Sequence, residues 1–221
     1  HPQEDRRCST ADLRSTTSSS GCSSRAPGIA GRAAIVGGEG EHGAGKSTLA
    51  ASVVEGLRAR GCTAVLVPMD GFHLANVALA ARGLADRKGA IETFDGAGFA
   101  ALLRRLRADG PDTVWAPTYD RSIEESVAGA IGVPPGTEVV VTEGNYLLVD
   151  EEPWSEVGQM LDEVWAVRAD PTVRTERLLA RHVQFGRSPE EARAWVAAVD
   201  EPNAVRIRET LHRADLDVVA G

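Results

Sequence analysis

Long apolar runs are absent from this 221-residue sequence. No stretch approaches the roughly 20 apolar residues that cross a bilayer, so we expect no membrane-spanning segment. Cysteine is also scarce: Cys8, Cys22 and Cys62 lack the paired close spacing of a zinc site and leave an odd thiol in any disulfide scheme. This cysteine usage favours a reduced, cytoplasmic setting.

Basic residues are fewer than acidic residues, and lysine is rare. The formal net charge is −8, which argues against a surface that neutralises phosphate backbones, so we expect no nucleic-acid partner. Only two of the 24 basic residues are lysines, Lys46 and Lys88. Hydrophobic residues make up 43% of the chain, enough for the core of one α/β domain without disulfide or metal staples.

The first 30 residues differ in composition from the rest. They are rich in Ser, Thr and Arg and contain no apolar stretch of signal-peptide length, while Glu4, Asp5 and Asp12 count against a transit peptide. We therefore expect a disordered Ser/Thr-rich tail over residues 1–30 and one folded domain over residues 31–221.

Apolar β-rich runs alternate with helical patterns from residue 33 onward. This order is typical of a parallel sheet covered by helices on both faces. The helical patterns cover residues 47–60, 98–108 and 171–185, and Ser188 opens a further helix with a capping-box pattern. The predicted strands cover residues 33–38, 63–68, 113–116, 138–142, 163–167 and 216–219.

A glycine-rich loop lies between the first predicted strand and helix. Residues 40–47 satisfy G-x-x-x-x-G-K-[ST], in which backbone N–H groups cradle phosphate oxygens at a helix N-terminus. Lys46 is expected to reach the β and γ phosphates of ATP, and Ser47 to hold Mg²⁺. The alternative is a flexible glycine turn. The residues predicted to bind the nucleotide are Gly40, Gly43, Ala44, Gly45, Lys46, Ser47 and Thr48.

Two acidic residues follow predicted strands, where open α/β sheets bind their ligands. Asp70 is expected to accept a proton from an attacking hydroxyl, and Glu143 to hold Mg²⁺ or orient the acceptor. The alternatives are an Asp-Gly turn or helix cap for Asp70 and a turn carboxylate for Glu143. A GTPase is disfavoured because no N-K-x-D sequence is present, and a helicase because the chain is short.

Three arginines, Arg174, Arg177 and Arg181, are spaced three and four residues apart and so share one side of a predicted helix. Such a stripe could close over transferring phosphates, and a solvated basic face is the alternative. Polar side chains in glycine-interrupted stretches could meet a substrate from loops. These are His73, Lys88, Tyr119 and Arg121.

Together these motifs resemble the P-loop nucleoside/nucleotide kinase-like family near uridine kinase and bacterial pantothenate kinase, especially its branch of fructose-transport or sugar kinases. The resemblance covers the chain from residue 33 to the end. Its phosphate loop is shared by a very large superfamily, whereas M-D-G-F-H, R-K-G-A-x-E-T-F-D and E-G-N-Y-L-L are specific to this branch. The matching segments are residues 40–48, 68–74, 87–95, 119–121, 143–148, 181–182 and 200–204.

The resemblance implies a three-layer α/β P-loop fold with a mainly five-stranded parallel sheet and a helical lid. It also implies ATP-dependent phosphoryl transfer to a hydroxyl of a small metabolite such as a sugar, a nucleoside or a pantothenate-like compound. The alternative is a nucleotide-binding regulatory or transport-accessory protein that turns over no metabolite. The oligomeric state is left open, a homo-oligomer included.

The resemblance also assigns roles to residues. Asp70 matches the base of the related kinases, and Glu143 matches the acidic residue near the metal and acceptor. The expected catalytic residues are Asp70, Lys46, Arg177 and Arg181, the last two in the lid. The expected metal ligands are Ser47 and Glu143. The expected acceptor-binding residues are His73, Lys88, Tyr119, Arg121, Glu143 and Asn145.

The loop departs from its relatives at Glu39 and Glu41, where apolar or proline residues are common. Two carboxylates pointing at the phosphates would weaken ATP binding by on the order of 1 kcal/mol each. We therefore expect both side chains to point outward, with His42 able to offset part of their charge when protonated.

Overall fold

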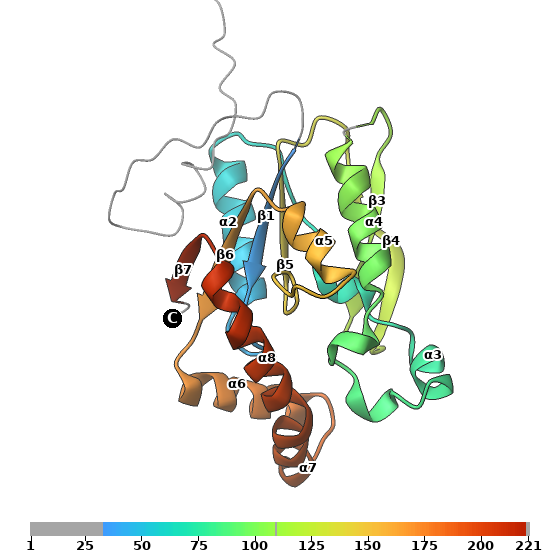
Figure 1. Ribbon diagram of the computed structural model, residues 1–221, viewed down its shortest axis with the longest axis vertical. Coiled ribbons are helices and arrows are strands. Elements are labelled where there is room, and N and C mark those ends of the chain that lie inside the picture. The colour runs from blue at the N-terminus through green and yellow to red at the C-terminus, as the bar shows by residue number, and fades with distance from the viewer. Residues whose placement is uncertain (1–32, 109, 220–221) are drawn as a thin grey trace, which may run out of the picture.

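A central parallel sheet organises the computed structural model, which describes residues 33–108 and 110–219. Its strand order is β2-β5-β1-β6-β7 and every neighbouring pair is parallel, which confirms the predicted five-stranded sheet. The strands are β1 (Ala34–Glu39), β2 (Ala64–Leu66), β5 (Val139–Gly144), β6 (Glu163–Arg168) and β7 (Leu216–Val219) (Figure 1).

Helices cover both faces of this sheet, which makes the predicted three layers. Val36 and Val141 pack against α2 (Lys46–Ala59) on one face. Ile35, next to Val36 in the strand, points to the other face and packs with residues of α4 (Gly96–Arg107) and α5 (Trp154–Gln159). Because both faces are covered, all six residues of β5 are buried, and the strand has no polar alternation.

A separate antiparallel hairpin stands beside the sheet. It consists of β3 (Val114–Asp120) and β4 (Glu125–Val133). The first of these strands was expected, but β4 was not, because its run of Ala and Gly is largely exposed and lacks an apolar pattern. Trp115 of β3 is 57% exposed, whereas Trp154 and Trp165 are buried.

A helical lid follows β6 and confirms the predicted lid. It contains α6 (Pro171–Gln184), α7 (Pro189–Trp195), a π-helical turn (Val196–Asp200) and α8 (Glu201–Thr210). Asp170 caps α6, and Ser188 forms the expected capping box with Glu191 at the start of α7. Figure 1 shows α6 and α7 beyond the ends to which the strand arrows point, so the lid faces the carboxyl edge of the sheet.

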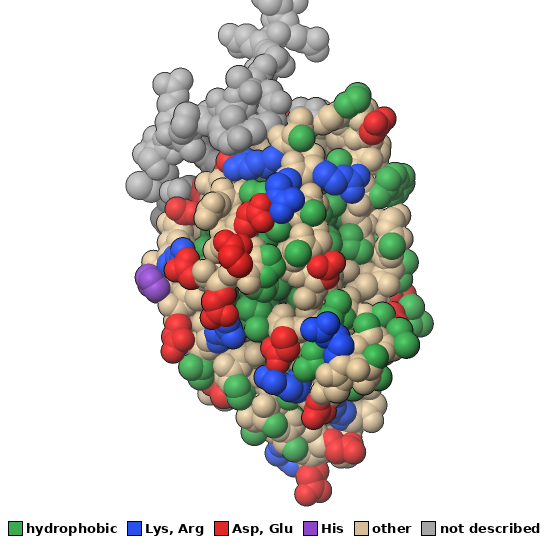
Figure 2. Space-filling model, turned by 45° about the vertical axis from the view of Figure 1, so that its right-hand side comes forward, with side chains coloured by type: hydrophobic (Ala, Val, Ile, Leu, Met, Phe, Trp, Pro, Cys, Tyr) green, Lys and Arg blue, Asp and Glu red, His purple; other side chains and the backbone are tan. Residues whose placement is uncertain are grey.

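Short elements complete the chain between β2 and α4 and after α8. They are α3 (Asn76–Ala81) and the 3₁₀ turns Met69–Phe72, Ala85–Arg87, Ile91–Thr93 and Leu211–Arg213. In the described part of the chain no helix is long and apolar enough to span a membrane. Acidic and basic side chains are interspersed on the face shown in Figure 2.

Two expectations concern the N-terminal part and the cysteines. The tail predicted over residues 1–30 lies outside the described residues. Cys62 is disulfide-bonded, which does not agree with the expectation of reduced thiols.

Candidate active site

The phosphate loop is shaped by glycines that no other residue replaces easily. Gly43 and Gly45 have φ angles of 81° and 93°, in the left-handed region that L side chains rarely adopt. A Cβ on Gly40 would lie 2.5 Å from the carbonyl oxygen of Val167. The loop therefore turns tightly out of β1 and leads into the N-terminus of the 14-residue helix α2, where free N–H groups favour an anion.

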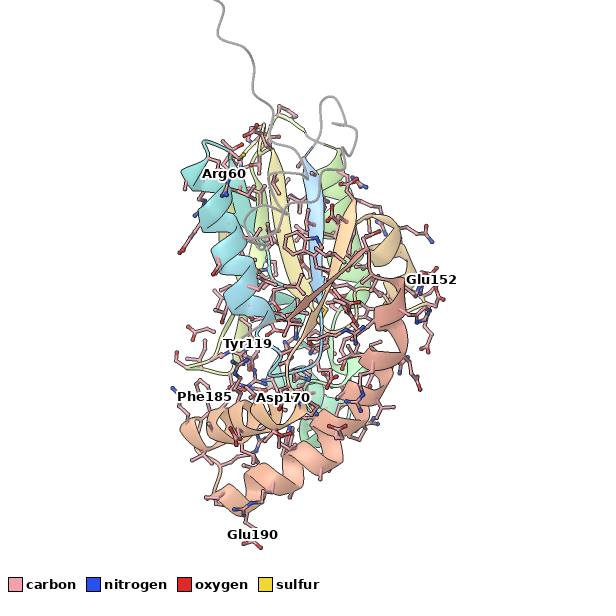
Figure 3. The ribbon with its side chains drawn as sticks, turned by 90° about the vertical axis from the view of Figure 1, so that its left-hand side faces the viewer. Arg60, Tyr119, Glu152, Asp170, Phe185 and Glu190 are labelled. Atoms are coloured by element: carbon pink, nitrogen blue, oxygen red, sulfur yellow. The ribbon has the colours of Figure 1, made fainter. Side chains whose placement is uncertain are left out.

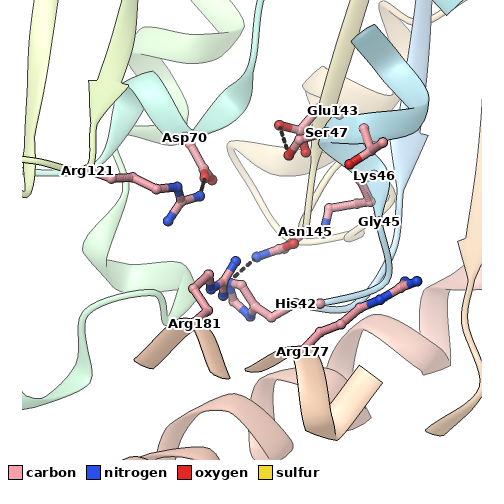
Figure 4. A pocket seen from close by; sticks show the side chains of 12 residues that line it. His42, Gly45, Lys46, Ser47, Asp70, Arg121, Glu143, Asn145, Arg177 and Arg181 are labelled. Carbon is pink, nitrogen blue, oxygen red and sulfur yellow. Dashed lines mark hydrogen bonds and ion pairs between the residues drawn. The ribbon is translucent and has the colours of Figure 1, made fainter. Parts of the chain in front are cut away.

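A cavity of about 180 Å³, the loop cavity, opens at this turn (Figure 4). In Figure 4, Asp70 and Arg121 face Lys46, Ser47 and Glu143 across it. The predicted Gly40 and Ala44 belong to the buried part of the loop and do not line the cavity. The cavity is lined by His42, Gly43, Gly45, Lys46, Ser47, Thr48, Asp70, Arg121, Glu143, Asn145, Arg177 and Arg181.

Lys46 is buried and donates a hydrogen bond from Nζ to the carbonyl oxygen of Glu41 at 3.0 Å. Burial lowers its pKa, and the carboxylates of Glu143 and Asp70 oppose that shift. The hydrogen bond holds the ammonium group at the cavity. Among the described residues, Lys46 forms no direct ion pair with a carboxylate.

Ser47 and Glu143 lie together, as expected of two groups that share a metal ion. The Ser47 hydroxyl donates to Oε1 of Glu143 at 3.1 Å. Burial, together with the negative charge of Asp70, raises the pKa of Glu143 to about 7. Hydroxyl and carboxylate oxygens fit Mg²⁺, which is commonly held by few protein groups together with substrate phosphates. No group of three or more His, Cys, Asp or Glu side chains that could hold a metal ion is found in residues 33–108 and 110–219.

Asp70 lies in the 3₁₀ turn that follows β2 and accepts a hydrogen bond from Arg121 Nη2 at 3.0 Å. Arg121 reaches it from the end of the hairpin strand β3. The carboxylate is partly exposed, with 25% of its side-chain surface accessible. Asp70 is therefore a hydrogen-bonded carboxylate that solvent or a ligand can still reach.

A second cavity of about 330 Å³, the lid cavity, adjoins the first. His42, Asp70, Arg121 and Arg181 line both cavities. The residues that line only the lid cavity come from the hairpin, the lid and the segment before α4. They are His73, Lys88, Gly89, Tyr119, Glu124, His182, Phe185, Gly186, Arg187, Trp195 and Asp200.

The expected acceptor-binding residues divide between the two cavities. His73, Lys88, Tyr119 and Arg121 line the lid cavity, whereas Glu143 and Asn145 line only the loop cavity. Figure 3 labels Tyr119 in the hairpin and Phe185 at the end of α6, on the same side of the molecule below the sheet.

Tyr119 lies at the centre of the hairpin side of the lid cavity. The centroid of its ring is 4.7 Å from that of His73, and its hydroxyl donates to Oε2 of Glu124 at 2.8 Å. Lys88 Nζ lies 5.2 Å from the same ring and donates to the carbonyl oxygen of Glu124 at 2.6 Å and to Asn76 Oδ1 at 2.7 Å. These contacts fix the wall before any ligand binds.

The three arginines of α6 do not act as one stripe. Arg181 lines both cavities and Arg177 lines the loop cavity. Arg174 is buried elsewhere and ion-pairs with Glu41 at 2.9 Å and with Glu201. Burial lowers the pKa of Arg181, and the neighbouring Arg121 adds to the shift by repulsion.

Glu39 and Glu41, the two acidic residues of the loop, have different surroundings. The expected outward orientation is wrong for Glu39. Its side chain is fully buried and accepts a hydrogen bond from the Leu147 amide at 2.6 Å. Burial raises its pKa to about 8. Glu41 ion-pairs with Arg174 and with Arg208 at 3.0 Å. Neither carboxylate lines the loop cavity.

Sequence reasoning gave no site role to several residues that line the cavities, namely Glu124, His182, Arg187, Trp195 and Asp200. Asn145 Nδ2 contacts His42 Nε2 at 2.5 Å, and burial holds the pKa of His42 well below its ordinary value. The segments 181–182 and 200–204 were among the matching motifs, which was the one signal pointing to His182 and Asp200.

The chain is similar to known proteins in sequence and in fold. A curated relative from Aspergillus versicolor, the ATP-dependent kinase-like protein notR', is 41% identical over 136 residues, which are 57% of this chain and 77% of that protein. The uncharacterized protein YggC of Escherichia coli K12 is 38% identical over 152 residues, 69% of this chain and 62% of that protein.

A solved structure from Silicibacter sp. TM1040, described as a "putative fructose transport system kinase", superposes with a TM-score of 0.77 at 38% identity. The superposition covers 87% of this chain and 92% of that one. The family model for phosphoribulokinase and uridine kinase matches residues 35–220. The chain therefore belongs to the phosphoribulokinase/uridine kinase family of P-loop, ATP-dependent kinases.

Proposed function

We propose that this protein transfers the γ-phosphoryl group of Mg-ATP to a hydroxyl of a small metabolite, such as a sugar, a nucleoside or a pantothenate-like compound. One observation carries the proposal: the loop cavity and the lid cavity meet at His42, Asp70, Arg121 and Arg181. A donor in one cavity and an acceptor in the other would therefore bring their reacting groups to the same four side chains.

The loop cavity would receive the triphosphate. In this role the loop residues from Gly40 to Thr48 surround the phosphates with backbone N–H groups, and Lys46 neutralises charge on the β and γ phosphates. Ser47 and Glu143 are the groups placed to hold Mg²⁺, directly or through water. Bound Mg²⁺ would offset negative charge on the phosphate oxygens.

Asp70 would act as the general base. The acceptor oxygen forms a bond to the γ phosphorus, its proton passes to the Asp70 carboxylate, and ADP leaves with the electrons of the broken P–O bond. Arg121 holds the carboxylate in place through the 3.0 Å hydrogen bond. Arg181 and Arg177 would stabilise charge on the transferring group and exclude water as the lid closes.

The acceptor would bind in the lid cavity against His73, Lys88, Tyr119 and Arg121, with Glu143 and Asn145 on the loop side. We further propose that residues 31–221 form one kinase domain that works in the cytoplasm, where ATP is available, without nucleic-acid or membrane partners. The match over residues 35–220 supports the domain, while the disulfide at Cys62 counts against a reducing compartment.

The test is Mg-ATP-dependent ADP release in the presence of pooled sugars, nucleosides and pantothenate, with product identified by the mass of one added phosphoryl group. A metabolite kinase releases ADP in response to a pool, and Asp70→Asn loses the response. Asp86→Asn is the matched control, because Asp86 is exposed and lines neither cavity. ATP binding without a response to any pool would favour the regulatory alternative.

A further inference from the structure

Most charges around the lid cavity are already paired with one another. Asp70 is hydrogen-bonded by Arg121, and Lys88 is held by Glu124 and by Asn76. Arg121 and Lys88 thus have acceptors within the protein. Two further arginines line the cavity, Arg181 and Arg187. Arg181 also lines the loop cavity, where its proposed role is to contact the donor phosphates. Arg187 lines the lid cavity alone.

Arg187 is a half-buried guanidinium with a fixed orientation. Its Cζ lies 3.8 Å from the centroid of the Trp195 ring, close enough for strong cation–π stacking. Its Nη1 contacts Nδ1 of His182 at 3.0 Å. In the described part of the chain it forms no ion pair with a carboxylate, and the contact with His182 engages one of its five N–H donors.

His182, the hydrogen-bond partner of Arg187, is itself held by a carboxylate. His182 Nε2 lies 2.7 Å from Oδ2 of Asp200, whose side chain is buried. A guanidinium only donates, so His182 accepts at Nδ1 and donates from Nε2 to Asp200. Asp200 therefore orients the imidazole, and the imidazole orients Arg187.

The positive charge of Arg187 helps to lower the pKa of Glu191. The carboxylate of Glu191 nevertheless has a different hydrogen-bond partner. Its side chain accepts a hydrogen bond from the Ser188 amide at 2.8 Å within the capping box of α7. A planar cation supported by Trp195 and His182, facing a cavity and lacking a carboxylate, matches the way arginines bind carboxylates and phosphates.

The contacts in the lid cavity give less support to a neutral ligand whose ring stacks on its aromatic side chains. Lys88 and Arg121 already lie over the Tyr119 ring at 5.2 Å and 5.7 Å from its centroid. Arg187 likewise occupies a face of Trp195. The aromatic surfaces of the cavity are therefore used to hold cations, which suits a ligand that carries negative charge.

We propose that the acceptor of this kinase is an anionic metabolite whose carboxylate or phosphate group binds to Arg187, while its reacting hydroxyl lies at Asp70. This proposal rests on the proposed function, in that the lid cavity receives the acceptor. It narrows the substrate class to hydroxy acids and phosphorylated sugars or nucleosides, and it disfavours their uncharged counterparts.

Anion binding can be measured without turnover. Protein saturated with Mg²⁺ and a non-hydrolysable ATP analogue, which fills the loop cavity, is titrated by calorimetry with malonate and with inorganic phosphate. We expect one of the two to bind, with its identity separating a carboxylate site from a phosphate site. Arg187→Gln should weaken that binding about 10-fold or more, the usual cost of losing a charged hydrogen-bond pair.

Two further variants keep this measurement interpretable. Arg187→Lys keeps the charge but loses the planar fork, so it should bind with intermediate affinity if the variant protein folds normally. Arg193 lies on α7, the helix that follows Arg187 in the chain, is exposed and lines neither cavity, so Arg193→Gln should bind the anion as the wild type does. Absence of anion binding to the wild type, or equal binding to Arg187→Gln, would overturn the proposal.

Turnover separates the failure of this proposal from the failure of the proposed function. The acceptors are compared in matched pairs: glycerate with glycerol, pantothenate with pantothenol, and fructose 6-phosphate with fructose. The charged member should have a kcat/KM about 10-fold or more above its partner, an advantage that Arg187→Gln removes. Preference for a neutral member would refute the anionic acceptor and leave the kinase intact. Turnover of no acceptor beside intact anion binding would count against the kinase function instead.

Discussion

The loop cavity and the lid cavity share four side chains but are assembled in different ways. Half of the residues that line the loop cavity come from one continuous segment, residues 42–48, and Glu143 and Asn145 come from the end of the neighbouring strand. The lid cavity draws on segments that are distant in the chain, with Asp70, Lys88, Tyr119 and Arg187 as examples. Binding of a common donor therefore depends on a local motif, and choice of acceptor depends on tertiary structure.

The largest expected effect comes from replacing the two lysines, because Lys46 lines only the loop cavity and Lys88 lines only the lid cavity. Lys46→Met should lower kcat by about 10³-fold with any acceptor, because the charge beside the transferring phosphate is lost. Lys88→Met should leave ATP affinity unchanged and raise the KM of the acceptor, because it loosens only the wall formed with Glu124.

Steady-state kinetics with ATP and acceptor varied separately provide the measurement. A loss of ATP affinity in Lys88→Met equal to that in Lys46→Met would show that the two cavities are not separable.

Glu39, immediately before the phosphate loop, gives a pH-dependent test of stability. Its pKa is about 8 in the folded protein and near 4.5 in the unfolded chain, so the folded state retains a proton over this interval. The stabilisation is complete below about pH 4.5 and is lost as the pH rises through 8, by on the order of a few kcal/mol.

Glu39→Gln stays neutral and can still accept from the Leu147 amide, so its stability should lack this contribution to the pH slope. Urea unfolding at pH 5.5 and 8.5 should show the two proteins similar at the lower pH and the wild type less stable at the higher pH. Identical slopes would mean that Glu39 is ionised in the folded state.

Tyr119→Phe is the smallest expected effect and concerns the lid cavity alone. The variant loses the 2.8 Å hydrogen bond to Glu124 and keeps the ring that packs with His73. A bond of this kind contributes about 0.5–1.5 kcal/mol, so the acceptor KM should rise by about 2- to 10-fold. The KM of ATP should stay constant, and a change in it alone would place Tyr119 on the donor side.

The same difference explains how much the sequence could predict. Residues 40–47 carry their own backbone requirements, so strand, loop and helix followed from them, as did the parallel sheet from its buried runs. Spacing could not separate Arg174 from Arg181, because their roles depend on Glu41 and Glu201, which only the folded chain brings near Arg174. The burial of Glu39 depends in the same way on the segment around Leu147.

If donor and acceptor meet at Asp70, Asp70→Asn should separate ATP affinity from acceptor-stimulated turnover, and measuring both in this variant is the most direct experiment. We expect kcat to fall by about 10²- to 10⁴-fold while the dissociation constant of Mg-ATP changes little, with Asp86→Asn behaving as the wild type. Full turnover in Asp70→Asn would contradict this expectation, because the carboxylate at the junction of the two cavities would then have no part in the reaction.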